Sequence, residues 1–279
     1  MKTGKLSLRW QIFLLILPII TGFICLCIGR ISIHPADIYA SFTGSTQVSV
    51  MTRMTVLNLR LPRILLAALT GAGLSAAGCA FQSLFANPLA TPDTLGVASG
   101  ASFGAALGLL LGLPILGVQM TALLMGGAAV AMTWVAGSGK SRGLSTVVLA
   151  GILILYLLRW RMNLLPLSED EVRSSGVNIS VLRGITVVCA TMITASCVSM
   201  CGQVGWVGLL IPHMCRMKFG SNHLSLLPAS ISFGAAFLII VDTVARSASA
   251  QEIPISILTA IIGAPFFIIL MRKSGGWSL

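Results

Sequence analysis

Long runs of apolar residues alternate with short polar turns along most of this chain. A membrane-spanning helix needs about 20 predominantly apolar residues, with tolerance down to about 17. The runs long enough to span are 10–29, 61–82, 94–112, 114–136, 184–202, 226–245 and 254–271. A shorter apolar run lies at 204–218. The pattern predicts an all-α protein, a polytopic transmembrane helix bundle of about eight spans that forms one domain over 1–279.

Segment 144–158 does not fit this pattern, because it has only 15 residues and carries basic residues at both ends. Two spans joined as a hairpin would need about 40 residues plus a turn. We therefore expect a tilted, interfacial or re-entrant segment in the inner half of the membrane. The helices that follow it should keep their orientation, with the loop 163–178 on the cytoplasmic side.

The composition supports a membrane protein, since 56% of the residues are hydrophobic and only 9% are charged. Soluble proteins carry about 25% charged residues. The net charge of +11 would suggest a nucleic-acid partner in a soluble protein, but here it fits the basic residues that orient membrane proteins. We expect no nucleic acid partner. An inner-membrane location with both termini cytoplasmic leaves five cations outside: Arg30, Arg53, Arg60, Arg63 and Arg246.

Catalytic and metal-binding signals are weak. The seven cysteines lie in or beside apolar runs without a C-x-x-C pair, so we interpret them as small hydrophobic residues. The stretch "GSGKS" at 137–141 resembles a phosphate-binding loop, but Trp134 stands where that motif needs a glycine. We expect no ATPase site, enzyme activity, cofactor or metal in this chain. His213 beside Pro212 is a candidate proton relay or metal ligand, although a structural hydrogen bond in the proline-broken helix is favoured.

Glycines recur every four residues in the third span, at Gly96, Gly100, Gly104, Gly108 and Gly112. Such a stripe lets another helix approach closely. We interpret it as a helix-packing surface.

The cytoplasmic loop 163–178 contains three of the seven acidic residues. Ser168 with Glu171 three residues later forms a capping pattern, and Gly176 is a natural helix end. A solvated connector and a docking element for a soluble partner are both compatible with this short polar helix.

Arg60, Arg63 and Arg246 are expected on the same outer side of the membrane. Guanidinium groups bind carboxylates through two parallel hydrogen bonds, so three of them form a good receptor for acidic side chains. Asp242 and Arg246 are spaced i, i+4 and could instead be a pair at the membrane interface.

Several longer stretches together resemble the permease family of iron-siderophore and vitamin B12 ABC importers, with an internal deletion. They occur in family order across most of the chain: "LRLPR" (59–63), "GAGLSAAGCAFQSLFANPLATPDTLGVASGAS" (71–102), "LSEDEVRSSGVN" (167–178), "GQVGWVGLLIPHMCR" (202–216), "LLPASISFGAAFLIIVDTVAR" (226–246) and "EIPISILTAIIGAPFFIIL" (252–270).

The resemblance implies a permease that moves an iron(III)-siderophore complex, driven by a separate ATPase. Its partners would be a second permease subunit in a homo- or heterodimer, cytoplasmic ATP-binding subunits, a periplasmic or lipid-anchored substrate-binding protein, and membrane lipid. The positions that match the family's binding-protein receptor are Arg60, Arg63 and Arg246. Those that match its ATPase-coupling helix are Ser168, Glu169, Asp170, Glu171, Arg173, Ser174 and Gly176.

The chain departs from the family in three places. The family usually has ten spans, and about two are missing between "VVLAGILI" and "LYLLRWRMNLL". Gln203 replaces a usual proline, and "GSNHLSLLP" (220–228) replaces the usual G-x-D-H-R. Cobalamin or haem import, a transport-defective remnant, and an intramembrane enzyme built on His213 and Asp242 therefore remain alternatives.

Overall fold

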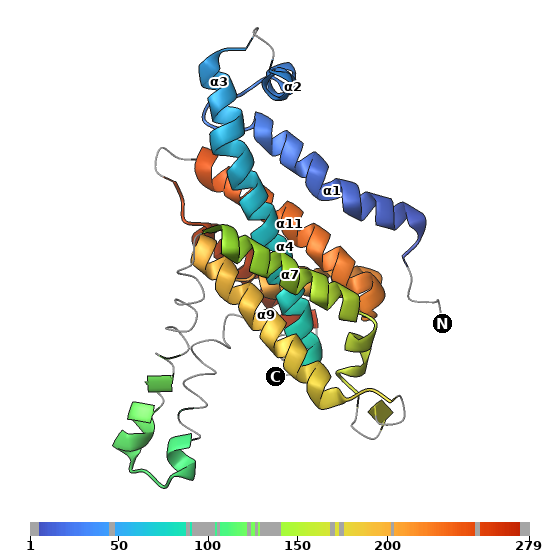
Figure 1. Ribbon diagram of the computed structural model, residues 1–279, viewed down its shortest axis with the longest axis vertical. Helices are drawn as coiled ribbons and strands as arrows, with labels where there is room; N and C mark the ends of the chain where they lie inside the picture. The colour runs from blue at the N-terminus through green and yellow to red at the C-terminus, as the bar shows by residue number, and fades with distance from the viewer. Residues whose placement is uncertain are drawn as a thin grey trace. The chain divides into compact units, whose positions relative to one another are not determined.

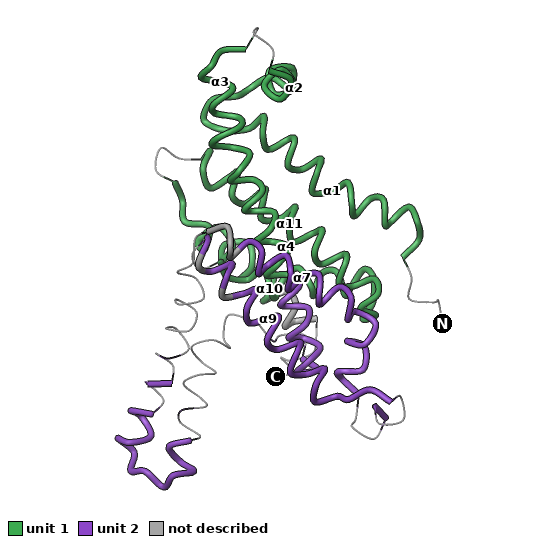
Figure 2. Tube along the Cα trace, in the orientation of Figure 1, with its two compact units in different colours: residues 1–75, 203–279 green, residues 76–202 purple. Residues whose placement is uncertain are grey.

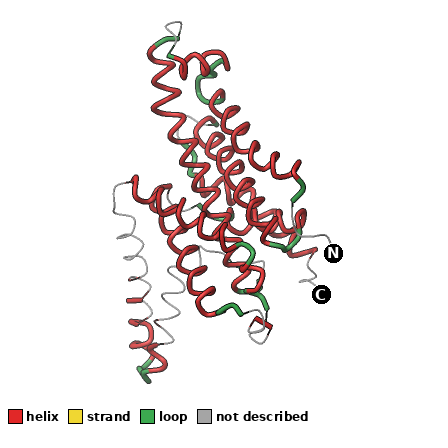
Figure 3. The backbone as a smooth tube through the Cα atoms, turned by 45° about the vertical axis from the view of Figure 1, so that its right-hand side comes forward, coloured by secondary structure: helices red, strands yellow, loops and turns green. Residues whose placement is uncertain are grey.

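The computed structural model describes residues 6–44, 48–87, 90, 104, 107–121, 124–125, 128, 141–167, 171–172, 176–201, 204–248 and 252–273. All regular secondary structure in these ranges is helical, as Figure 3 shows. The predicted all-α class is therefore confirmed for the described part of the chain.

Figure 1 shows the described helices along the chain. In chain order they are α1 (Leu8–Cys27), α2 (Pro35–Thr43), α3 (Val50–Met54), the π-helical turn η1 (Thr55–Arg60), α4 (Leu61–Leu84), α7 (Ser141–Leu158), the 3₁₀ turn η3 (Arg161–Leu164), α9 (Ile179–Cys201), α10 (Val207–Phe219), α11 (His223–Ser247) and α12 (Ile255–Lys273).

Within the described residues, four helical stretches are long and apolar enough to cross a membrane, so the chain is a multi-pass membrane protein. They are Leu8–Cys27, Val50–Leu84, Ile179–Val198 and His223–Ser247, and shorter apolar helices occupy Ser145–Leu158 and Ile255–Ile268. The spans predicted at 94–112 and 114–136 lie mostly outside the described residues. The boundary expected between these two spans lies among the described residues. There, Gly112 adopts a positive φ of 66° in a turn between helical residues 107–110 and 115–121.

The chain divides into two compact units, coloured separately in Figure 2. Unit 1 combines Met1–Ser75 with Gln203–Leu279, and unit 2 contains Ala76–Gly202. The expectation that 1–279 works as one transmembrane domain stays a prediction.

Unit 1 is organised around α11, which packs along both α1 and α10. The hydroxyl of Ser232 in α11 donates a hydrogen bond to the carbonyl oxygen of Leu14 in α1. Helices α4 and α11 cross very closely, because a Cβ built on Gly71 would collide with the backbone carbonyl of Gly234. Small residues at a crossing allow this approach and the van der Waals contact that holds helices together in a membrane.

Unit 2 contains a pair formed by α7 and α9. Val148 and Leu155 of α7 are fully buried, and a Cβ on Gly151 between them would lie 2.5 Å from the Cγ1 atom of Ile193 in α9. These α7 positions are spaced i, i+3, i+7, which places them on one helical face. The segment 144–158 makes up most of α7 and runs to its last residue. The expectation that it is tilted, interfacial or re-entrant in the membrane stays a prediction.

Candidate functional site

Arg60 and Arg63 lie at a local irregularity of the backbone. The π-helical turn η1 ends at Arg60, and the N–H of Leu61 bonds to the carbonyl of Val56, five residues earlier. Pro62 has no N–H to donate to the carbonyl four residues earlier. This missing bond favours a departure from the regular α-helical hydrogen-bond pattern just before it. Single π turns inside α-helices are frequent at functional sites.

Arg60 is buried, with 6% of its surface exposed. Its Nη1 donates to the carbonyl oxygen of Leu26 at 2.6 Å, and its Nη2 donates to that of Ile31. Leu26 lies in the last turn of α1, where carbonyl groups have no partner within the helix and a nearby cation is favourable. Arg60 therefore fixes the end of α1 to the start of α4.

Arg246 approaches the same end of α1 from α11. Its Nη2 donates to the carbonyl oxygen of Cys25 at 2.9 Å. A Cβ on Gly29 would lie 2.7 Å from Nη2 of Arg60 and 3.3 Å from Nη1 of Arg246. The chain leaving α1 thus passes between two guanidinium groups at a position where only glycine fits without a shift.

Arg63 bridges two carboxylates. Its Nε donates to Asp242 Oδ1 at 2.9 Å and to Oδ2 at 3.2 Å, while Nη1 donates to Oε1 and Oε2 of Glu252 at 2.9 Å each. The side chains differ in exposure: 36% for Arg63, 4% for Asp242 and 55% for Glu252.

Asp242 is the buried centre of this cluster. Besides Arg63, it faces Nε of Arg246, which lies 3.8 Å from its Oδ2. A buried carboxylate is tolerated only when cations and hydrogen bonds compensate its lost hydration, and the two arginines provide both. We call Arg60, Arg63, Asp242, Arg246 and Glu252 the outer charged cluster, after the side of the membrane that the sequence predicts for its arginines. Its three cations and two acids leave one excess positive charge.

Unit 1 therefore brings together all three arginines selected from the sequence, along with Asp242. Sequence reasoning missed the role of Glu252 and of Gly29. The available signal for Glu252 was that it is one of only seven acids in the chain and lies two residues before Pro254. The receptor role of the arginines stays a prediction.

The coupling residues lie mostly outside the described part of the chain. This holds for Ser168, Glu169, Asp170, Arg173 and Ser174. Glu171 is helical and exposed, and Gly176 has a positive φ of 70°, the conformation that a helix-ending glycine commonly adopts. The ATPase-coupling role of this loop stays a prediction.

The glycine stripe is described only in part, since Gly96 and Gly100 lie outside the described residues. Gly104 is helical and buried. A Cβ on Gly108 would lie 2.9 Å from the Cα of Val118, so residues 107–110 and 115–121 approach closely there. Gly112 forms the turn instead of a packing contact, and the packing role of the whole stripe stays a prediction.

His213 lies in α10 one residue after Pro212, and its buried Nδ1 has no hydrogen-bond partner among the described residues. Within those residues, no three His, Cys, Asp or Glu side chains gather in a way that could hold a metal ion. Five of the seven cysteines are buried, as expected for small hydrophobic side chains.

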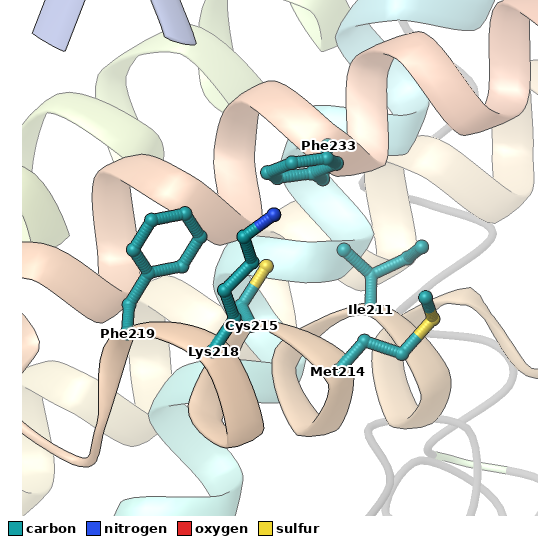
Figure 4. Close-up of a pocket in the computed structure, with 6 residues that line it drawn as sticks. All are labelled: Ile211, Met214, Cys215, Lys218, Phe219 and Phe233. Atoms are coloured by element: carbon teal, nitrogen blue, oxygen red, sulfur yellow. The ribbon is translucent and has the colours of Figure 1, made fainter. Parts of the chain in front are cut away.

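Unit 1 also contains a largely apolar depression (Figure 4). It has a volume of about 170 Å³ and is lined by Ile211, Met214, Cys215, Lys218, Phe219 and Phe233. Lys218 Nζ also lies 4.9 Å from the ring centre of Trp10. Small-molecule sites usually occupy about 300–1,000 Å³. This depression is smaller than that range.

Comparison with known families finds one match, which comes in two parts. The model of the FecCD transport family matches residues 15–159 and again 142–273. Residues 142–159 are therefore matched twice, once at the end of the first part and once at the start of the second. This repeated segment is where the sequence pattern placed the missing spans.

Characterised relatives align along nearly the whole chain. The molybdate import system permease protein MolB of Haemophilus influenzae is 34% identical over 93% of this chain and 94% of its own length. The vitamin B12 import system permease protein BtuC of Klebsiella pneumoniae is 32% identical, covering 97% and 95%. The Fe(3+)-citrate import system permease protein YfmE of Bacillus subtilis is 31% identical, covering 97% and 98%.

The chain is also shorter than these relatives. The alignment with the Haemophilus protein has 318 positions but uses 93% of 279 residues, or about 259, so about 59 positions have no counterpart here. That length corresponds to two spans of about 20 residues with their connections. Among solved structures, an ABC transporter assigned to the metal-chelate type, in an inward-facing conformation, matches with a TM-score of 0.72 and 32% identity, covering 96% of this chain and all of the other.

Proposed function

This chain belongs to the FecCD transport family, and we propose that it is the permease subunit of an ABC importer that carries an iron(III)-siderophore complex across the inner membrane. The observation that carries the proposal is the match along 15–273, including the segments that hold the outer charged cluster. The relatives named above import iron citrate, vitamin B12 and molybdate, so these substrates, with haem, are the competing candidates.

Uptake in a permease-null strain tests the substrate. The chain, expressed with its ATPase and substrate-binding protein, should restore growth on one or more iron(III)-siderophores under iron limitation. Cobalamin, haem and molybdate are offered in parallel. Rescue by one of these instead would replace the proposed substrate and retain the permease function.

A transport-defective remnant is the second candidate, and the missing 59 or so aligned positions favour it. The regular packing of α7 against α9 argues the other way, because the shortened region forms an ordered helix pair with a buried face. Failure of every substrate in the uptake assay, with the importer assembled in the membrane, would favour the remnant.

We also propose that the outer charged cluster receives acidic side chains of the substrate-binding protein. Arg63 supports this best, since its guanidinium is partly exposed, whereas Arg60 is committed to the end of α1. Arg63→Glu should weaken binding of that protein by at least tenfold, because two like charges would then meet. An acid-to-lysine change on the binding protein should restore part of the affinity. Unchanged affinity after reversal of each of the three arginines would reject the docking site.

The ATPase would contact the segment 168–176, which is acidic and expected on the cytoplasmic side. Glu169→Cys and Ser174→Cys should crosslink to cysteines placed on the ATPase surface. A cysteine at Ser49, expected on the opposite side, provides the control. Copurification of the ATPase without any crosslink would exclude this loop as the contact.

A further inference from the structure

Arg63 already holds a carboxylate at its exposed edge, and from this we infer that the docking site works by carboxylate exchange. In the free permease, Glu252 occupies Arg63; on docking, an acid of the substrate-binding protein displaces Glu252 and takes over the guanidinium. The inference rests on the docking role proposed above. It identifies Glu252 as an internal competitor of the partner's acid.

The two acids on Arg63 are not equivalent. Asp242 is buried and lies near a second cation, Arg246, so removing it would leave two neighbouring cations uncompensated. The side chain of Glu252 is more than half exposed. An exposed ion pair stabilises a protein by about 0–1 kcal/mol, so Glu252 can leave Arg63 at little cost. Exchange is therefore confined to the Glu252 side of the guanidinium.

The geometry of the Glu252 contact also favours replacement. Both carboxylate oxygens of Glu252 share one nitrogen, Nη1, at 2.9 Å each. The strongest arginine–carboxylate arrangement uses two parallel hydrogen bonds from two nitrogens. A carboxylate that approaches from outside can adopt this arrangement, while the attachment of Glu252 to its own backbone keeps it in the weaker one.

The backbone around Glu252 allows its side chain to move alone. Residues 252–254 are not helical, but the N–H of Ile253 bonds to the carbonyl of Ala245 at the end of α11, at 3.1 Å. The next residue, Pro254, precedes α12 and has a fixed φ. A change of side-chain rotamer is then enough to release Arg63, without moving either helix.

The exchange would also make docking selective. With Glu252 in place, the exposed charge of Arg63 is balanced, so a free anion must compete with a tethered carboxylate. A binding protein offers several acids at once to several arginines, and linked contacts gain a large effective concentration that a free anion lacks. Glu252 therefore lowers the affinity of Arg63 for every anion. A partner that makes several contacts at once is weakened least by this competition.

Binding measurements on the assembled importer in nanodiscs test the exchange, with the purified substrate-binding protein of the same importer as the probe. Removing the competitor through Glu252→Gln should tighten binding about two- to fivefold at low salt, the range expected from an exposed ion pair. The gain should shrink as salt rises, because exposed charges are screened. Asp37→Asn, in the first turn of α2, removes the same charge without touching Arg63 and should change affinity less.

A double-mutant cycle with Arg63→Gln tests whether Glu252 acts through Arg63. If Glu252 acts through Arg63, adding Glu252→Gln to Arg63→Gln should give no further gain, because the competed guanidinium is absent. An equal gain in both backgrounds, or no gain over Asp37→Asn, would overturn the exchange while leaving docking intact. If none of the arginine reversals alters affinity, docking and exchange both fail.

Discussion

The outer charged cluster of unit 1 and the α7–α9 pair of unit 2 are held by different forces. The cluster joins residues 179 and 189 positions apart through hydrogen bonds and ion pairs around a buried carboxylate. The α7–α9 pair joins two helices near each other in the chain through apolar side chains and one close glycine. A membrane provides little hydrophobic drive for helix association, so both packing and polar bonds are needed.

The difference predicts opposite sensitivities to mutation. The cluster depends on each charge having its partner, so the loss of one group leaves another uncompensated. The α7–α9 pair depends on how its apolar side chains fit together, and small shifts of these side chains can accommodate a change in volume. The following experiments contrast the two regions, beginning with the largest effect.

Asp242→Ala should cause the largest loss, because it removes the carboxylate between Arg63 and Arg246. Breaking a buried ion pair costs about 3–5 kcal/mol of folding free energy. Thermal unfolding of the purified protein in detergent, followed by loss of the monodisperse peak in size exclusion, measures the effect. Glu252→Ala is the matched control and should cost less than about 1 kcal/mol as an exposed pair. Equal destabilisation by the two variants would contradict the assignment of Asp242 as the buried centre.

Gly71→Ala and Gly151→Ala compare the close contacts of the two units. A Cβ at Gly71 meets the backbone carbonyl of Gly234, which cannot move without shifting a helix. A Cβ at Gly151 meets the Cγ1 and Cδ1 atoms of Ile193, which belong to a side chain and can shift more easily than a main-chain carbonyl. Overpacking typically costs about 1–3 kcal/mol, so Gly71→Ala should fall at the upper end.

Gly151→Ala should be milder, because it displaces a side chain and not the backbone of a second helix. Both glycines are helical, so both variants recover the same helix propensity of about 1 kcal/mol. Differential scanning fluorimetry of both variants in one detergent gives the comparison. A larger loss of thermal stability for Gly151→Ala than for Gly71→Ala would show that the α7–α9 contact is the less adaptable of the two.

Cysteine labelling gives the smallest expected difference, since both ends of α7 should behave alike. Gly139→Cys and Asn163→Cys should react with a membrane-impermeant thiol reagent only from the cytoplasmic side, in a background without the native cysteines. The physical reason is the cost of moving Arg159 and Arg161 across, about 2.5–3.5 kcal/mol per charge at the membrane centre. Labelling of Asn163→Cys from outside would instead make α7 a true span and invert the helices after it.

The amino-acid sequence by itself determined the all-α class, the multi-pass character and the family. Hydropathy and helical period are local properties, and Pro62, Gly112 and Gly176 act on the few residues around them. The grouping of Arg60, Arg63 and Arg246 could be predicted as well, because alternating spans place loops on defined sides.

Only the tertiary structure decided how each charge is used. Arg60 bonds to the carbonyls at the end of α1, Gly29 passes between two guanidiniums, and Glu252 meets an arginine 189 residues away. It also decided that α7 lies against α9. These contacts depend on where helices cross, and crossing is set by small residues and side-chain fit between segments distant in sequence. No local pattern encodes that fit, because each partner is defined only once the other is in place.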